Sequence, residues 1–295
     1  MDGVLLIDKP GGLTSHDVVA RIRRSSGEKR VGHTGTLDPR ATGLLPLVMG
    51  RATRLASRIT GGAKTYEAVI QLGIATDTDD ADGRPIGEAV TVTSSASDVA
   101  AALAGFQGTF EQMPPAHSAK KVGGRKAYDL ARRSQPVELA AVPVTIHDLT
   151  CSSIEGTLVS LRVTVSAGFY VRSLARDLGE RLGCGAHLAS LRRTGSGDFG
   201  VAQATSLDAA EREGLAIAGR LIPPSAVLPH LPAVTMTEGG LARVLHGNAI
   251  GPEHLTGHVL PPPSAGELRL MGPGGQLVAL AHSRGGALHP VLVLG

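Results

Sequence analysis

Asp38 is the residue whose type and setting best suit chemistry. It lies in residues 31–46, VGHTGTLDPRATGLLP, directly before Pro39 and shortly before the apolar run 43–49. Because a proline disfavours the helical region for the residue before it, we expect extended or turn backbone at Asp38, with the side chain projecting from a loop. A loop carboxylate held by a rigid apolar element can act as a nucleophile or a general base. Asp-Pro pairs also begin ordinary turns, so this pattern alone leaves a structural role open.

The elements before and after this loop follow from hydrophobic spacing and turn signals. Residues 3–8 are an apolar run closed by a Lys-Pro-Gly-Gly turn, which predicts a strand. Thr14 precedes apolar residues at helical spacing, so we expect a capped helix that runs to about Arg24. Residues 51–59 carry arginines on one face and apolar side chains on the other, which predicts an amphipathic helix.

Further along the chain, two segments are expected to present side chains to the same site. Residues 64–72 alternate as a strand, with Tyr66 on the inward face. Residues 158–165 predict another strand, which leads into an extended segment where Tyr170 and Arg172 share one face because they lie two residues apart. A helix over 173–182, ended by Gly183, should follow.

Three patterns that could indicate a metal or a nucleotide do not meet the geometry required. The acidic stretch 76–83 resembles a calcium loop, but its fifth ligand place is Ala81 and its glycine is one place late. The GSGDFG string at 195–200 matches a dinucleotide fingerprint, but no apolar strand is expected before it. Cys151 and Cys184 are the only cysteines and belong to no metal-binding spacing. We therefore expect no metal, no nucleotide cofactor and no disulfide.

Basic residues are concentrated in two stretches, although the net charge of the chain is only +3. Residues 21–30 contain five basic residues against Glu28, and residues 117–133 contain six against Asp129. Such patches suit the repeated phosphates of a nucleic-acid backbone, but each could also be an ordinary solvated helix face.

Several blocks of the sequence, taken in order, resemble the TruB family of pseudouridine synthases, which isomerise a uridine in the T arm of tRNA, conventionally U55. They are GVLLIDKPGGLTSHDVV (3–19), GHTGTLDPRATGLLP (32–46), KTYEAVIQLGIATDTDDADG (64–83), PPAHSAKKVGGRKAYDLAR (114–132) and GFYVRSLARDLGERLGCGAHLASLRR (168–193). The resemblance covers most of residues 1–200 and implies an enzyme that needs no cofactor.

The resemblance also implies a role for individual residues. Asp38 would be the catalytic carboxylate, Arg172 its cationic partner, and Tyr66 a base-stacking residue or a proton relay. His33 would meet the RNA beside the flipped nucleotide, and Lys9 is interpreted as structural support. The remaining substrate-binding residues expected are Tyr170, Leu191, Lys120, Lys121, Arg125 and Arg193.

The fold that the resemblance implies is α+β. Residues 1–230 would form a catalytic domain with a mixed, largely antiparallel central sheet flanked by helices. A thumb-like RNA-binding loop is expected over about 114–133, where a helix would begin near Arg125. From residue 231 short apolar strands alternate with Gly/Pro turns, so residues 231–295 are expected to form a small β-rich, PUA-like domain. That segment has no Phe, Tyr or Trp, which argues against strong RNA contact by base stacking.

Two other functions share this sequence pattern. One is a tRNA-binding or tRNA-folding protein that uses the same cleft without catalysis, which the presence of Asp38 disfavours. The other is an archaeal or eukaryotic-type relative in a guide-RNA particle, which the compact chain disfavours. With 42% hydrophobic residues and no apolar run of membrane-spanning length, we expect a soluble, cytoplasmic protein that binds no membrane. The resemblance implies tRNA as the partner, and we expect a monomer.

Overall fold

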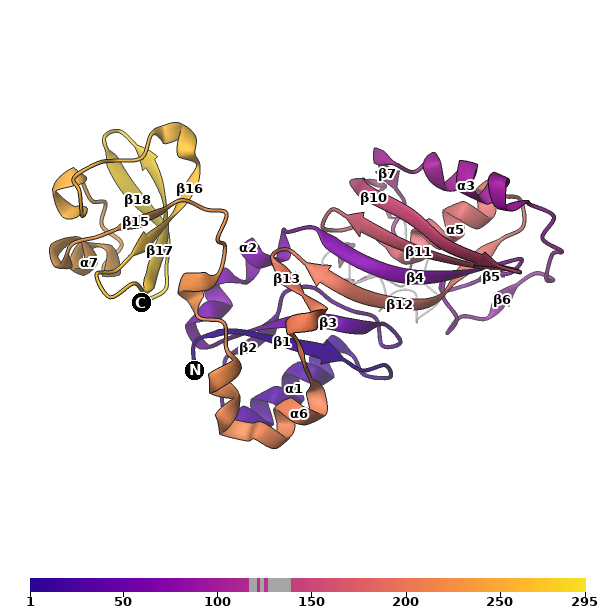
Figure 1. The fold of residues 1–295 in the computed structure, drawn as a ribbon, viewed down its shortest axis with the longest axis horizontal. Coiled ribbons are helices and arrows are strands. Elements are labelled where there is room, and N and C mark those ends of the chain that lie inside the picture. Colours follow the sequence, from indigo (N-terminus) through magenta and orange to yellow (C-terminus); the bar gives the residue numbers. More distant parts are fainter. Residues whose placement is uncertain (117–120, 123–124, 127–138) are drawn as a thin grey trace.

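A computed structural model describes residues 1–116, 121–122, 125–126 and 139–295. Its centre is a ten-stranded sheet in the order β14-β1-β3-β12-β4-β11-β10-β7, with β2 beside β3 and β13 beside β12 (Figure 1). The β1/β14 and β3/β12 pairs are parallel, and the other pairs are antiparallel. The expected α+β fold with a mixed, largely antiparallel sheet is confirmed.

The strands of this sheet differ widely in length. They are β1 (Gly3–Lys9), β2 (Val31–His33), β3 (Thr42–Met49), β4 (Lys64–Leu72), β7 (Gly108–Gln112), β10 (Val142–Glu155), β11 (Leu158–Val165), β12 (Ala186–Ser196), β13 (Phe199–Gly200) and β14 (Thr205–Ser206). Two small hairpins are formed by β5 (Ala75–Thr76) with β6 (Pro85–Ile86) and by β8 (Lys121–Val122) with β9 (Arg125–Lys126).

The described helices are short to medium in length. The α-helices are α1 (Ser15–Ser26), α2 (Ala56–Thr60), α3 (Ala96–Ala104), α5 (Val171–Arg181), α6 (Leu207–Glu213) and α7 (Glu238–Leu245). The 3-10 segments are η1 (Gly50–Leu55), η2 (Val201–Gln203), η3 (Gly214–Arg220), η4 (Pro224–Ala226), η5 (Pro252–His254) and η6 (Pro263–Ala265). Within the described ranges, no helix combines the length and the apolar character needed to cross a membrane.

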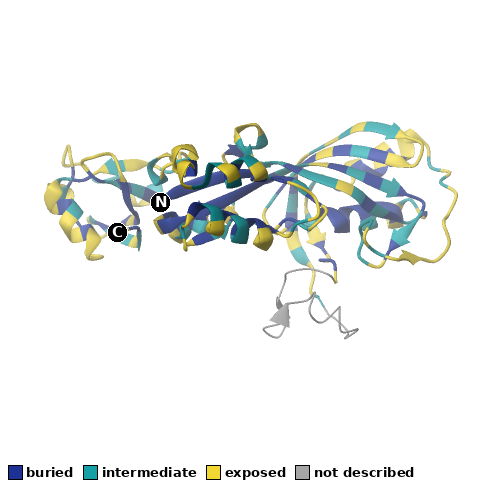
Figure 2. Ribbon diagram, turned by 90° about the horizontal axis from the view of Figure 1, so that it is seen from below, coloured by how far each residue is buried: buried dark blue, intermediate teal, exposed yellow. Residues whose placement is uncertain are grey.

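Helices cover the sheet in two separate places (Figures 1 and 2). α3 and α5 pack on the β4, β10 and β11 half, where the inward residues of β4, Ile70 among them, meet Leu174 and Leu178. α1 and α6 pack on the β1 and β3 half, where Ile22 of α1 meets Ile7. The loop that carries Asp38 joins β2 to β3, and α5 begins on the other half. The site is therefore assembled where the two halves of the sheet meet.

Local sequence signals account for several element ends. Thr14 caps α1 in a reciprocal box with Asp17, and the helix ends at Gly27 with a φ of 68°. Gly183, with a φ of 69°, follows α5 as expected. The single helix predicted over 51–59 is instead a 3-10 segment, η1, followed directly by the short α-helix α2.

Two local predictions are wrong. The first wrong prediction is that no strand precedes the GSGDFG string at 195–200. Strand β12 runs into the string as far as Ser196, and the chain then turns back into β13. No helix follows that turn directly, so the strand-to-helix geometry of a dinucleotide site is absent there. The helix expected from Arg125 is also wrong at its start, since Arg125–Lys126 form β9. The remainder of the predicted thumb helix lies outside the described residues.

The C-terminal segment forms a four-stranded sheet with α7 packed against it. Its strands are β15 (Ala233–Thr235), β16 (Glu267–Met271), β17 (Leu277–Arg284) and β18 (Ala287–Val293), in that order. Leu280 of β17 is fully buried in a cluster with Val4 and Leu44 from strands β1 and β3. Arg58 of α2 also pairs with Glu267 of β16 at 2.8 Å. The module therefore shares a hydrophobic core with the rest of the chain.

We predict that Leu280→Ala destabilises the whole protein, not the module alone. Removing a buried leucine side chain should lower the free energy of unfolding by about 2–5 kcal/mol, because it leaves a cavity in the shared cluster. Leu215→Ala, at a leucine that is 71% exposed, is the control and should change it by less than about 0.5 kcal/mol. Denaturant unfolding followed by circular dichroism should show one transition for both variants; separate transitions for the two parts would contradict a shared core.

Candidate active site

The loop that carries Asp38 is fixed by buried polar side chains on both sides of that residue. Lys9 lies at the end of β1 and is completely buried, and its Nζ donates hydrogen bonds to three carbonyl oxygens, including that of Pro39 at 3.0 Å. The Oγ of Ser15 accepts from the Leu37 N–H at 2.8 Å. Asp38 is therefore held between two anchored neighbours, which restricts the direction of its side chain. This geometry supports the structural reading of Lys9.

Arg193 of β12 anchors the same loop from the opposite side. Its side chain is 1% exposed, and its guanidinium donates to the carbonyl oxygens of Leu44 at 2.7 Å and Gly35 at 3.1 Å. The backbone of Arg193 lies so close to Gly43 that a Cβ there would meet its carbonyl oxygen at 2.2 Å. These contacts show that Arg193 supports the loop, and it also lines the cavity described below. The expected contact of Arg193 with the RNA stays a prediction.

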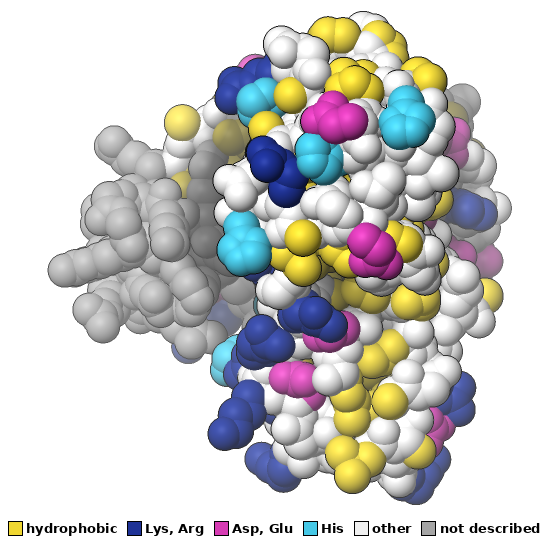
Figure 3. Space-filling view, turned by 90° about the vertical axis from the view of Figure 1, so that its left-hand side faces the viewer, with side chains coloured by type: hydrophobic (Ala, Val, Ile, Leu, Met, Phe, Trp, Pro, Cys, Tyr) yellow, Lys and Arg dark blue, Asp and Glu magenta, His cyan; other side chains and the backbone are white. Residues whose placement is uncertain are grey.

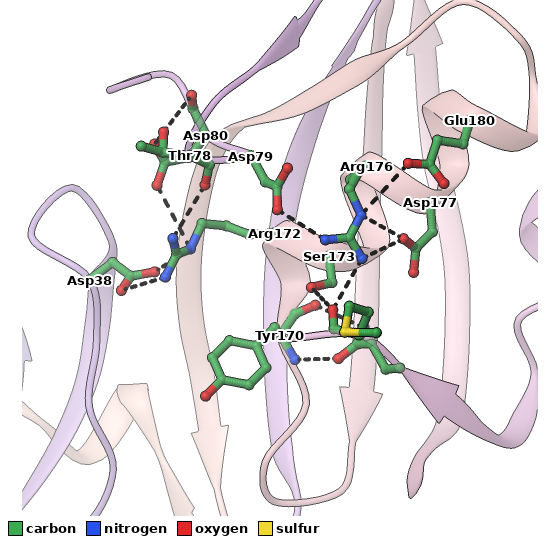
Figure 4. A network of polar contacts seen from close by, with 12 residues as sticks. Asp38, Thr78, Asp79, Asp80, Tyr170, Arg172, Ser173, Arg176, Asp177 and Glu180 are labelled. Atoms are coloured by element: carbon green, nitrogen blue, oxygen red, sulfur yellow. Dashed lines mark hydrogen bonds and ion pairs between the residues drawn. The ribbon is translucent and has the colours of Figure 1, made fainter. Parts of the chain in front are cut away.

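Arg172 pairs with Asp38 through two contacts, as Figure 4 shows. Its Nε lies 3.0 Å from Asp38 Oδ2, and its Nη2 donates to Oδ1 at 3.2 Å. The Arg172 side chain is 7% exposed, whereas that of Asp38 is 39% exposed. A fork of two hydrogen bonds fixes the plane of the carboxylate and leaves one edge of it open.

Arg172 is itself oriented by the acidic turn at 76–83. Its Nη1 donates to the Thr78 carbonyl at 3.3 Å, and its Nε lies 3.7 Å from Asp80 Oδ2. Asp80 is fixed in turn by the Thr78 hydroxyl, which donates to Oδ1 at 2.6 Å. The sequence pattern that was tested as a calcium loop therefore supplies partners for an arginine. Over the described ranges, no group of three or more His, Cys, Asp or Glu residues is placed to hold a metal ion.

The charge state of Asp38 reflects competing effects. Burial raises the pKa of the carboxyl above its usual value of 3.8, Arg172 lowers it, and the nearby Asp80 carboxylate raises it again. Arg172 acts in the expected direction, but burial outweighs it. The proton affinity of the Asp38 carboxyl therefore depends on both Arg172, which lowers it, and Asp80, which raises it.

A cavity of about 240 Å³ opens in front of Asp38. Asp38, Tyr66, Tyr170, Arg172, Leu191 and Arg193 all line it, so the structure brings six of the predicted residues together. His33 does not line it; it ends β2, where its Nδ1 accepts from the Gly35 N–H at 3.4 Å. Burial lowers the pKa of His33 below its usual value, which favours the neutral ring.

The two tyrosines reach the cavity from different elements. Tyr66 lies on β4, opposite Arg193 in the strand ladder. It packs against the core cluster that contains Ala68 and Ile70, so the inward direction predicted from the period-two pattern is confirmed. Tyr170 is the residue before α5, and its ring extends toward the side on which Asp38 lies (Figure 4). The expectation that Tyr170 and Arg172 share one face of an extended segment is wrong, because Val171 already begins α5. Arg172 instead reaches Asp38 from the first helical turn.

The sequence interpretation missed two residues of the site, Asp80 and Lys64. Lys64 lines the cavity, and its Nζ donates to the carbonyl oxygens of Thr60 and Gly62. Burial lowers the pKa of Lys64 to about 8, and the neighbouring Arg193 adds to this shift. The only sequence signal for Lys64 was its place at the start of the Tyr66 strand, since strand periodicity says nothing about cation placement.

The expected thumb contacts remain predictions. Lys120 lies outside the described residues, and Lys121 and Arg125 lie in the short strands β8 and β9.

Comparison with known proteins places the fold and the site in one class. Residues 23–171 match the N-terminal domain of the TruB family pseudouridylate synthases. Residues 172–215 match the tRNA pseudouridylate synthase B C-terminal domain. Asp38, Tyr66 and Tyr170 lie within the first region, and Arg172 opens the second. The mixed sheet with a single loop carboxylate facing a cavity is thus that of a pseudouridine synthase.

Curated relatives narrow the class to a family. A protein named tRNA pseudouridine synthase B from Thermobifida fusca is 44% identical over 99% of this chain and 98% of that protein. One of the same name from Solibacter usitatus is 48% identical over 84% of this chain and 85% of that protein. The chain belongs to the TruB family of pseudouridylate synthases.

Solved structures agree with the fold. A Cbf5-Nop10-Gar1 complex contains a chain that matches 99% of this one with a TM-score of 0.74 and 27% identity, covering 85% of that chain. An H/ACA RNP bound to a substrate RNA containing 2′-deoxyuridine gives a TM-score of 0.73 at 25% identity, with the same coverage. The similarity spans both the catalytic sheet and the C-terminal module.

We predict that Asp80→Asn and Arg172→Gln shift the pKa of Asp38 in opposite directions. Removing the Asp80 charge should lower that pKa, and removing the Arg172 charge should raise it. NMR titration of ¹³C-labelled aspartate carboxyl groups measures both, with the Asp38 signal assigned by its loss in Asp38→Asn. Two shifts of the same sign, or none, would contradict the proposed balance of charges.

Proposed function

We propose that this protein isomerises uridine to pseudouridine in the T-loop of tRNA, at position 55. The observation that carries the proposal is the single loop carboxylate, Asp38, paired with Arg172 at a cavity lined by Tyr66 and Tyr170. Membership of the TruB family supports the reaction, and the relatives named tRNA pseudouridine synthase B support tRNA as the substrate.

The reaction exchanges one glycosidic bond for another. The N1–C1′ bond breaks, the uracil turns, a C1′–C5 bond forms, C5 loses its proton and N1 gains one. There is no net oxidation, so one carboxylate that acts as nucleophile or general base is sufficient. Asp38 is suited to either task because the Arg172 fork orients its carboxylate while 39% of its side chain stays open. Tyr66 is available in the cavity as a stacking partner or proton relay.

The target base must leave the folded T-loop to reach Asp38. Flipping a base out costs a few kcal/mol, and stacking on an aromatic side chain returns about 1–3 kcal/mol per base. Tyr66 and Tyr170 line the cavity, and Leu191 adds an apolar wall. We propose that these three side chains hold the flipped uracil. His33, half-buried at the end of β2, is proposed to meet the RNA beside it.

Phosphate contacts are proposed for the exposed cations of the first basic stretch. Arg21 is 3.6 Å from Glu211, and Arg23 donates to the Val31 carbonyl, so both have protein partners. Lys29 and Arg30 are exposed and make no ion pair with the described residues. On the face shown in Figure 3, Lys and Arg side chains gather mainly in the lower half.

We also propose the domain division at residue 230, with a PUA-like module over 231–295. The upper half of the face in Figure 3 carries more histidines and fewer Lys and Arg side chains, consistent with the balanced charge of that segment. A structural contribution through the shared core around Leu280 suits this module better than strong phosphate binding. A tRNA substrate would place the protein in the cytoplasm.

We predict that Asp38→Asn abolishes isomerisation while tRNA binding stays close to that of the native protein. Loss of an essential base or nucleophile should lower the turnover rate by at least about 10²–10⁴-fold. Asp148→Asn, at an exposed aspartate outside the cavity, is the matched control and should turn over normally. Mass spectrometry after carbodiimide labelling of pseudouridine measures the product. Turnover above a tenth of the native rate in Asp38→Asn would remove Asp38 from the reaction.

We predict that the Lys29→Ala/Arg30→Ala double variant binds tRNA more weakly and with less salt dependence. If both cations neutralise phosphates, the slope of log affinity against log salt concentration should fall in magnitude by roughly one to two. Arg220→Ala is the control, because Arg220 is paired with Glu213. Filter binding between about 50 and 200 mM salt measures the slopes. An unchanged slope in the double variant would make this stretch an ordinary solvated surface.

A further inference from the structure

Gln112 is buried beside the site but is absent from the lining of the cavity. It is the last residue of β7 and is 1% exposed. Its side-chain amide makes two hydrogen bonds to the backbone of Tyr170: the Tyr170 N–H donates to Oε1 at 2.9 Å, and Nε2 donates to the Tyr170 carbonyl at 3.1 Å. One side chain therefore satisfies both polar backbone groups of a cavity residue, as a neighbouring strand would.

These two hydrogen bonds act where α5 begins. Tyr170 is the N-cap of α5, its own side chain makes no capping bond, and its carbonyl also accepts from the Leu174 N–H at 3.2 Å. Gln112 supplies the Tyr170 N–H with a hydrogen-bond acceptor at the point where the chain enters the helix. The amide thus fixes the backbone from which the Tyr170 ring and the first turn of α5 extend.

The next residue of the chain strengthens the same junction. The Met113 carbonyl accepts from the Ser173 hydroxyl at 2.8 Å and from Arg176 Nη2 at 3.1 Å. Arg176 also pairs with Asp79 of the acidic turn at 3.3 Å. Residues 112 and 113 are therefore hydrogen-bonded to the start of α5. Figure 4 shows that Arg172 and Arg176 of this helix pair in turn with Asp80 and Asp79 of the acidic segment.

We propose that Gln112 is a positioning residue for the reaction: by clamping the Tyr170 backbone, it sets the start of α5 so that Arg172 meets Asp38 in the two-contact geometry. The inference rests on the proposed function for its kinetic consequence, but the clamp itself is a statement about this fold. A displacement of about 1 Å at a reacting group can cost about 10²-fold in rate, so a small loss of register at α5 is sufficient to matter.

Two variants and a control test this role. Gln112→Met keeps the length of the side chain and removes both hydrogen bonds; it should lower kcat on tRNA by about 10–10²-fold, with a smaller rise in KM because Tyr170 is proposed to contact the base. Gln71→Met is the control, because Gln71 also donates from its amide to a backbone carbonyl, that of Leu72 at 2.7 Å, but at the far end of β4. It should keep the native kcat.

Gln112→Glu gives a readout that a purely structural role would not move. A protonated glutamic acid can donate to the Tyr170 carbonyl and accept from its N–H, whereas a carboxylate cannot donate. Burial should raise the pKa of the introduced carboxyl, so its neutral form should persist to a higher pH than that of an exposed glutamate. The ratio of its kcat to the native kcat should fall as pH rises, while the ratio for Gln112→Met should stay constant. This variant also keeps the test decisive if Gln112→Met does not fold.

The outcomes separate this inference from the function it rests on. Native kcat in Gln112→Met, or a lower melting temperature with unchanged kcat, would overturn it. If the native protein turned over no tRNA uridine, the proposed function would fail, and the Asp38 carboxyl titration would still decide the clamp. A raised pKa of Asp38 in Gln112→Met would show that Arg172 has moved away, and an unchanged one would refute the clamp.

Discussion

The ion pair between Arg172 and Asp38 is the interaction on which the rest of the site depends. A carboxylate in a half-buried cavity tends to take up a proton, and burial does raise the pKa of Asp38. The guanidinium opposes this shift and fixes the carboxylate plane, but it must itself be held. Asp80 and the Thr78 carbonyl hold it on one side, and the start of α5 holds it on the other. One charge contact thus draws together the loop, the acidic turn and the helix.

Two further buried cations, Lys9 and Arg193, stabilise the loop that carries Asp38. Lys9 and Arg193 are fully buried and donate to backbone carbonyls around Asp38. Burying a charge is costly unless it is well hydrogen-bonded, and here the carbonyl acceptors of an irregular loop supply the bonds. These hydrogen bonds offset the free-energy cost of burying the two charges, and they hold the loop in one conformation. The mixed sheet makes this possible because β1, β3 and β12 lie side by side and bring both cations to the same segment.

The sequence was most informative where a local rule decides the structure. Pro39 predicted the loop conformation of Asp38, Thr14 predicted the start of α1, and alternation predicted the inward direction of Tyr66. It was least informative where long-range packing contributes: the start of α5 at Val171 follows Tyr170, whose backbone is hydrogen-bonded to Gln112, 58 residues earlier. The burial of Arg193 and the pairing of Asp80 with Arg172 likewise join segments distant in sequence. Family resemblance predicted Asp38 and Arg172 as a catalytic pair, and the structure shows that they form an ion pair and which residues hold it.

The most direct measurement is tritium release from tRNA transcripts labelled with [5-³H]uridine, because forming the C1′–C5 bond must expel the proton on C5. The native protein should release about one tritium per transcript, from the target uridine at position 55, and it should release none when that uridine is replaced by cytidine. Equal release from both transcripts would contradict the assigned position. Binding of the transcript without any release would contradict the central claim, and would instead favour a protein that binds tRNA through this cleft without reacting.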